Sequence, residues 1–135
     1  MNYISTLAWL PEGEKRQNHL DYLLTATKDV VDLFAEKFLK LWDEVVTDEM
    51  AKTPGFKEWY LEDVLVNTAG VAGCEMIRRS VGFAHVKDLD SIPDDTLREK
   101  ALKTNILLAK HLIKNRHEFT TGAAYQKVVK EITLD

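Results

Sequence analysis

The sequence predicts an all-α protein, and three observations lead to this prediction. Apolar residues recur in steps of three and four over long stretches, the period of a helix with one buried face. The 135 residues include only six Gly and three Pro, so the turns that a many-stranded fold needs are scarce. No segment shows a sustained strand alternation, and no linker or internal repeat divides the chain. We therefore expect a single helical domain over residues 1–135 with about four main helices.

Composition and charge exclude several classes of protein. Apolar residues make up 45% and charged residues 30%, which is typical of a folded globular domain. Lys and Arg number 18 against 22 Asp and Glu, a balance that argues against a duplex nucleic acid partner. No apolar run approaches the roughly 18 residues of a membrane span, and the first ten residues lack the basic start of a targeting signal. We expect a cytoplasmic protein that binds neither nucleic acid nor membrane.

Two long helices are predicted in the first two thirds of the chain. The first covers roughly residues 15–47, and Thr53-Pro54 is expected to cap the second, at about residues 56–81, which Gly82 ends. Few polar residues occur from 64 to 77, so the second helix is expected to be buried on most sides, with Cys74 inert inside it. Gly70 and Gly73 would permit a close neighbour. The predicted buried face of the first helix consists of Leu20, Leu23, Leu24, Val30, Val31, Phe34, Phe38, Leu41, Trp42 and Val45.

Residues 83–90 are expected to form a loop, followed by two more helices. Ser91-Ile92-Pro93-Asp94 resembles an N-terminal capping arrangement for the third helix. Thr120-Thr121-Gly122 is expected to start a last short helix that carries Tyr125, Val128, Val129 and Ile132. The predicted buried face of the third helix consists of Leu97, Ala101, Leu102, Ile106, Leu107, Leu112 and Ile113.

The familiar signatures of a self-contained enzyme are absent from the sequence. None of the four histidines has a Glu three residues before it, and no HExxH, phosphate-binding glycine loop or G-x-S-x-G elbow occurs. His85 with Asp88 and Asp90 could be read as metal ligands, but a third well-placed ligand is not evident, so a loop histidine beside helix-preceding acids is favoured. We predict no catalytic residue and no metal ligand.

The paired arginines Arg78 and Arg79 are the one candidate binding feature. Adjacent residues on a helix point about 100° apart, so both cannot lie on one exposed stripe. A guanidinium group is a rigid fork of charged donors that suits carboxylates, phosphates or sugar hydroxyls. The alternative is a pair of cations that stabilises a helix C-terminus through its dipole.

The segment from Gly70 to Asp90, GVAGCEMIRRSVGFAHVKDLD, resembles the C-terminal helical region of S-methyl-5-thioribose kinases. The resemblance extends upstream through residues 38–42 and 55–60, and downstream through 99–102 and 112–116. It implies the fold of the aminoglycoside and choline kinases, and transfer of the ATP γ-phosphate to the 1-hydroxyl of methylthioribose in methionine salvage. It also implies that Arg78 and Arg79 contact the sugar near that oxygen.

The sequence departs from this family in what a kinase needs for catalysis. No histidine is followed by Gly-Asp, the catalytic-loop signature of the family, and the regions that bind ATP and Mg²⁺ are not matched. We therefore expect a substrate-binding part that is inactive alone and holds no cofactor. The alternative is a non-enzymatic helical module that self-associates. Either way, faces that carry Leu7, Trp9 and Leu10, or the helix over 64–77, would be left bare, which predicts a homo-oligomer or docking to the missing kinase lobes.

Overall fold

The computed structural model describes residues 3–4, 7, 10–83 and 86–134, and within these ranges all regular structure is helical. The predicted all-α class is confirmed, as are four long helices. The helices are α1 (Glu14–Val45), η2 (Glu49–Lys52), α2 (Phe56–Val81), α3 (Lys87–Asp90), α4 (Asp95–Lys114), η3 (Arg116–Glu118) and α5 (Gly122–Leu134). No helix of the described chain is both long and apolar enough to cross a membrane.

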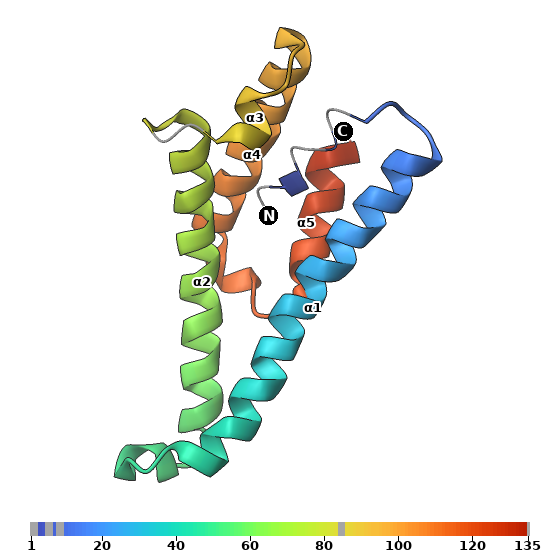
Figure 1. Cartoon of the computed structure of the whole chain (residues 1–135). Helices are drawn as coiled ribbons and strands as arrows, with labels where there is room; N and C mark the ends of the chain where they lie inside the picture. The colour runs from blue at the N-terminus through green and yellow to red at the C-terminus, as the bar shows by residue number, and fades with distance from the viewer. Residues whose placement is uncertain (1–2, 5–6, 8–9, 84–85, 135) are drawn as a thin grey trace.

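α1 and α2 form a V-shaped hairpin, and α4 and α5 pack against them at its open end (Figure 1). α1 and α2 meet at η2 and diverge from there. α5 packs along the N-terminal half of α1, and α4 packs along the C-terminal half of α2. A 32-residue helix is about 48 Å long and a 13-residue helix about 20 Å, so α5 can cover only part of α1. At the closed end, η2 is the one other helix of the described chain that lies beside α1 and α2 (Figure 1).

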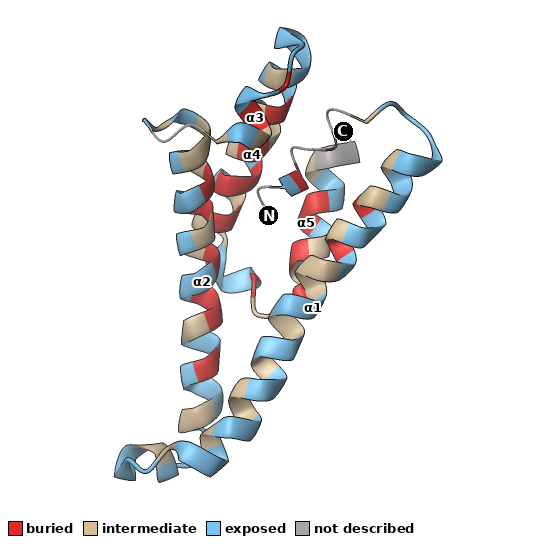
Figure 2. Ribbon diagram, viewed as in Figure 1, coloured by how far each residue is buried: buried red, intermediate tan, exposed pale blue. Residues whose placement is uncertain are grey.

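The hydrophobic core lies between the four long helices at the open end (Figure 2). A second, small cluster of Leu89, Ile92 and Ala101 fixes α3 against α4. Leu7, which was expected to be bare, is buried in the main core, and Trp9 lies outside the described residues. The main core consists of Ile4, Leu7, Leu20, Leu24, Ala69, Met76, Leu108, Ala109, Leu112, Phe119, Tyr125, Val128 and Val129.

Burial corrects the predicted helix faces. On α1 only Leu20 and Leu24 of the predicted face are buried, whereas Leu23, Val31, Phe38 and Trp42 are partly buried and the other members are exposed. α2 is not buried on most sides: Val71 and Cys74 are exposed, so the Cys74 thiol is not enclosed in the core. On α4 the buried face is rotated from the predicted one; Leu97 and Leu107 are exposed, and the buried residues are Ala101, Asn105, Leu108, Ala109 and Leu112.

The helix ends were predicted well, but their caps were not. α2 spans the predicted residues and ends at Gly82, yet its N-cap is Gly55, at φ 79°, rather than Thr53. α4 is capped by Asp94, whose carboxylate accepts the Leu97 N–H at 2.9 Å, rather than by Ser91. The predicted loop over 83–90 contains the four-residue helix α3. α5 begins at Gly122 as predicted.

Asp32 joins α1 to the start of α5. Its Oδ1 accepts the Gly122 N–H at 2.8 Å, and its Oδ2 pairs with Lys28 Nζ at 2.9 Å. The hydrogen bond from Lys28, followed by that from the Gly122 backbone, lowers the pKa of Asp32. Asp32 therefore satisfies one of the donors that a helix N-terminus leaves without a partner inside the helix.

We expect Asp32→Asn to lower the free energy of unfolding by less than about 1 kcal/mol, since the side chain is 39% exposed and solvent screens its charge. A carboxylate with a lowered pKa stabilises the fold above its ordinary pKa near 4, and this stabilisation is lost as pH falls through the lowered value. The difference in the free energy of unfolding between the parent and Asp32→Asn should thus be largest at pH 7 and disappear below about pH 4. Urea unfolding across this range measures it, and a difference independent of pH would contradict the role of the charge.

Candidate functional site

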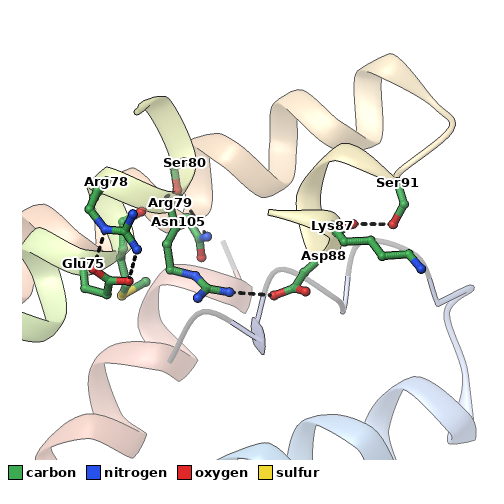
Figure 3. Close-up of polar contacts among 9 residues, drawn as sticks. Glu75, Arg78, Arg79, Ser80, Lys87, Asp88, Ser91 and Asn105 are labelled. Carbon is green, nitrogen blue, oxygen red and sulfur yellow. Dashed lines mark hydrogen bonds and ion pairs between the residues drawn. The ribbon is translucent and has the colours of Figure 1, made fainter. Parts of the chain in front are cut away.

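The candidate site is the C-terminal end of α2, where it meets α3 and α4. Arg78 and Arg79 occupy the last turn of α2, and the Gly82 N–H closes this turn by donating to the Arg78 carbonyl at 3.0 Å. Cations are stabilised at this end of a helix, which accounts for the position of both residues but not for their different surroundings. As expected from their 100° separation, the two side chains point to different partners (Figure 3).

Arg78 lies on the outer surface of α2, paired with Glu75 one turn earlier. Its Nε and Nη2 donate to the two oxygens of Glu75 at 2.7 and 2.5 Å, a bidentate geometry. The pairing lowers the pKa of Glu75 and raises the pKa of Arg78. The Arg78 side chain remains 54% exposed. Its charge is thus locally compensated at the surface.

Arg79 points towards α3 and is more enclosed. Its Nη2 lies 3.4 Å from Asp88 Oδ2, and the two side chains are 31% and 23% exposed. The Nε of Arg79 is buried, and no acceptor for it exists among the described residues. A buried donor without a partner is costly, at about 1–3 kcal/mol, so this guanidinium group has unused hydrogen-bonding capacity. Arg79 is therefore held at the junction of α2 and α3 by a single long contact.

A polar pair, the buried Asn105 and the partly buried Ser80, links the same turn of α2 to α4. Asn105 is fully buried, and its Nδ2 donates to Ser80 Oγ at 3.4 Å. Ser80 Oγ in turn donates to the Met76 carbonyl at 2.8 Å. Asn105 was not among the residues predicted to matter, although it lies at a core position four residues after Ala101. A polar residue at a core position of the helical period can be recognised in the sequence. It indicates a specific contact, because buried polar groups need hydrogen-bond partners.

The acidic residues near the site do not gather into a metal centre. Within the described part of the chain, no three His, Cys, Asp or Glu side chains lie close enough to hold a metal ion. Asp88 instead pairs with Arg79, and His85, the third member of the group considered in the sequence, lies outside the described residues.

Comparison with known proteins relates the chain to enzymes that transfer phosphoryl groups. No protein-family model matches it. The relatives compared below are all methylthioribose kinases. The chain is 36% identical over 125 residues to the methylthioribose kinase of Bacillus pumilus, a match that covers 89% of this chain and 30% of that protein. It is 37% identical to the enzyme of Geobacillus kaustophilus (74% of this chain, 25% of that protein) and 39% identical to that of an Enterobacter strain (67% and 23%).

The chain is therefore homologous to a part of methylthioribose kinases, as the resemblance in sequence predicted. It spans between about a quarter and a third of the length of these relatives. A match over 89% of 135 residues leaves at most about 15 residues unmatched, so the similarity to the Bacillus pumilus enzyme includes all of α2 with Arg78 and Arg79. The candidate site lies inside the shared region.

Proposed function

We propose that the chain supplies part of the sugar-binding site of a methylthioribose kinase. The activity is the ATP-dependent phosphorylation of S-methyl-5-thioribose on its 1-hydroxyl. The observation that supports this is the homology to methylthioribose kinases across α2, the helix that carries both arginines. Phosphoryl transfer depends on a positioned nucleotide and metal ion, and the described residues contain no cluster of ligands for a metal ion, so the chain alone is expected to be inactive.

Within this proposal, Arg79 contacts the sugar and Arg78 does not. Two of the five N–H groups of Arg78 donate to Glu75 on the outer surface, whereas Arg79 has one long contact and a buried Nε without an acceptor among the described residues. A cation held in a partly enclosed position can orient the sugar hydroxyl. It can also offset negative charge that spreads over the transferring phosphoryl group, without reorganisation at the moment of reaction. Asp88 is then a positioning residue for Arg79.

We expect Arg79→Gln to weaken methylthioribose binding at least about tenfold, because hydrogen bonds to charged groups contribute about 1.5–3 kcal/mol each. The matched variant Arg78→Gln, one residue away and equal in charge change, should weaken binding less than about threefold. Arg79→Lys should also bind weakly, since an ammonium group lacks the guanidinium fork. Titration calorimetry measures all three affinities, and circular dichroism checks that each variant is folded. Equal losses in the Gln variants would contradict the assignment of Arg79.

The second candidate function is a non-enzymatic helical module that binds a partner. It is favoured by the apolar residues that α1 leaves exposed along its second half, including Phe34, Leu41 and Val45. A folded chain that binds no methylthioribose, yet associates through these residues, would support this function over the first.

A further inference from the structure

Asn105 is a polar residue on the buried face of α4. It is 0% exposed, and within the described part of the chain no other polar or charged residue is buried. The other buried residues of this face are apolar, among them Ala101, Leu108 and Leu112. A leucine would fill a similar volume without an amide group that costs free energy to bury. The amide of Asn105 is therefore expected to make a specific contact rather than to fill space.

This contact is with the last turn of α2, at the residue that follows Arg79. The Asn105 Nδ2 donates to Ser80 Oγ at 3.4 Å, and Ser80 Oγ donates to the Met76 carbonyl at 2.8 Å (Figure 3). A hydroxyl group has one proton, which Ser80 gives to Met76, so its oxygen is left to accept from Asn105. Met76 is itself 2% exposed and anchored in the core. The last turn of α2 is thus tied to α4 through Ser80.

α4 also holds α3, the short helix that carries Asp88. Leu89, the next residue, is 1% exposed and belongs to the same small cluster as Ala101 of α4. Ala101 lies four residues, about one turn, before Asn105. Two successive turns of α4 therefore hold the two elements whose side chains, Arg79 and Asp88, meet at the candidate site.

The guanidinium group of Arg79 depends on this frame because its own contacts are few. It has the single 3.4 Å contact to Asp88, and its buried Nε has no acceptor among the described residues. A long side chain with one long contact is not fixed by that contact alone, because ordering it costs conformational entropy. Its position is then set by the backbone of the last turn of α2. A displacement of about 1 Å is enough to impair a binding geometry.

We propose that Asn105, acting through Ser80, is a positioning residue for Arg79. The inference rests on the proposed function for the identity of the ligand, and on the contacts above for the effect on Arg79. Asn105 is fully buried and does not touch the sugar. It holds the end of α2, which leads into the exposed Phe83, against the fraying to which helix ends are prone. The guanidinium group is then in place before the sugar arrives, which lowers the cost of binding.

Proton exchange at Arg79 measures this positioning without any ligand. In the ¹⁵N-labelled chain the Arg79 Nε–H signal is identified by its loss in Arg79→Gln, and it should exchange slowly with water because the group is buried. We expect exchange at least about tenfold faster in Ser80→Ala and in Asn105→Leu, which each remove the link to α4. Ser80→Thr keeps the hydroxyl group and should retain the parental rate. Leu108→Val, a change in the apolar core of α4, is the control and should also retain it.

Calorimetric titration with methylthioribose measures the effect on the sugar site. Ser80→Ala and Asn105→Leu should weaken binding about threefold or more, and Ser80→Thr and Leu108→Val less than about twofold. In Arg79→Gln, adding Ser80→Ala should cause no further loss, because the effect acts through the guanidinium group that is already absent. In Arg78→Gln the same addition should weaken binding as much as it does in the parent. A general loosening of the fold would act equally in both backgrounds.

The two measurements separate this inference from the proposed function. Unchanged Arg79 Nε–H exchange in Ser80→Ala and Asn105→Leu would overturn the positioning role. So would a loss of affinity from Ser80→Ala that is as large in Arg79→Gln as in the parent. If the parent binds no methylthioribose while exchange responds as expected, the proposed function fails and the role of Asn105 in holding Arg79 is upheld.

Discussion

Replacing Gly122 by alanine is expected to lower the free energy of unfolding by about 3 kcal/mol, the upper end of the usual cost of overpacking. A Cβ at this position would lie 2.6 Å from Lys28 Cα and would also collide with the Lys28 carbonyl oxygen. Both atoms belong to the backbone of α1 and cannot rotate away, so α5 must move outward. That movement would also lengthen the hydrogen bond from the Gly122 N–H to Asp32.

Urea unfolding followed by circular dichroism measures this loss, and the exposed neighbour Ala123 provides the control. Ala123→Gly changes backbone freedom in the same turn without touching α1, and it should cost about 1 kcal/mol or less. If Gly122→Ala were as stable as the parent, α5 would not approach α1 this closely, and the core at the open end of the hairpin would be arranged differently.

Gly73→Ala is expected to destabilise the packing of α2 on α4. The added Cβ would lie 2.6 Å from the Ala109 carbonyl oxygen and 2.7 Å from Ile113 Cγ1. Overpacking typically costs about 1–3 kcal/mol, and the rigid carbonyl places this case near the upper end. Alanine recovers about 1 kcal/mol of helix propensity, so the net loss should be about 2 kcal/mol.

Gly70→Ala is the matched comparison on the same helix. Its nearest neighbour would be Arg116 Cδ at 3.6 Å, an ordinary contact with a flexible side chain. The gain in propensity then dominates, and the variant should be up to about 1 kcal/mol more stable than the parent. The two substitutions are thus expected to have opposite signs in the same urea titration. A shared sign would mean that α4 does not approach α2 specifically at Gly73.

The glycines illustrate what could be predicted from the sequence and what could not. Two glycines in an apolar helix indicated close packing, but the spacing did not say which of them meets a neighbour. The limits of α1, α2 and α5 follow from local signals, namely apolar periodicity and Gly at helix ends, and these were predicted within two residues. Which apolar face is covered depends on the lengths and positions of other helices. The stripe around Phe34 and Leu41 was therefore assigned to the core, although α5 is too short to reach it.

At the candidate site too, features set by local helix geometry could be predicted and features set by tertiary contacts could not. That Arg78 and Arg79 diverge follows from helix geometry alone, and the sequence singled them out. Their different environments depend on tertiary contacts: α3, predicted as loop, brings Asp88 to Arg79, while Glu75 happens to lie one turn before Arg78. Asn105 was overlooked because the predicted face of α4 was rotated away from it.

The most direct measurement of the central proposal is a calorimetric titration of methylthioribose into the unmodified chain. A sugar-binding part of a methylthioribose kinase predicts saturable heat with one site per chain, lost in Arg79→Gln and retained in Arg78→Gln. No saturable heat from a chain that is fully helical by circular dichroism would contradict the proposal. The homology to methylthioribose kinases would then describe the origin of this sequence rather than what the chain binds.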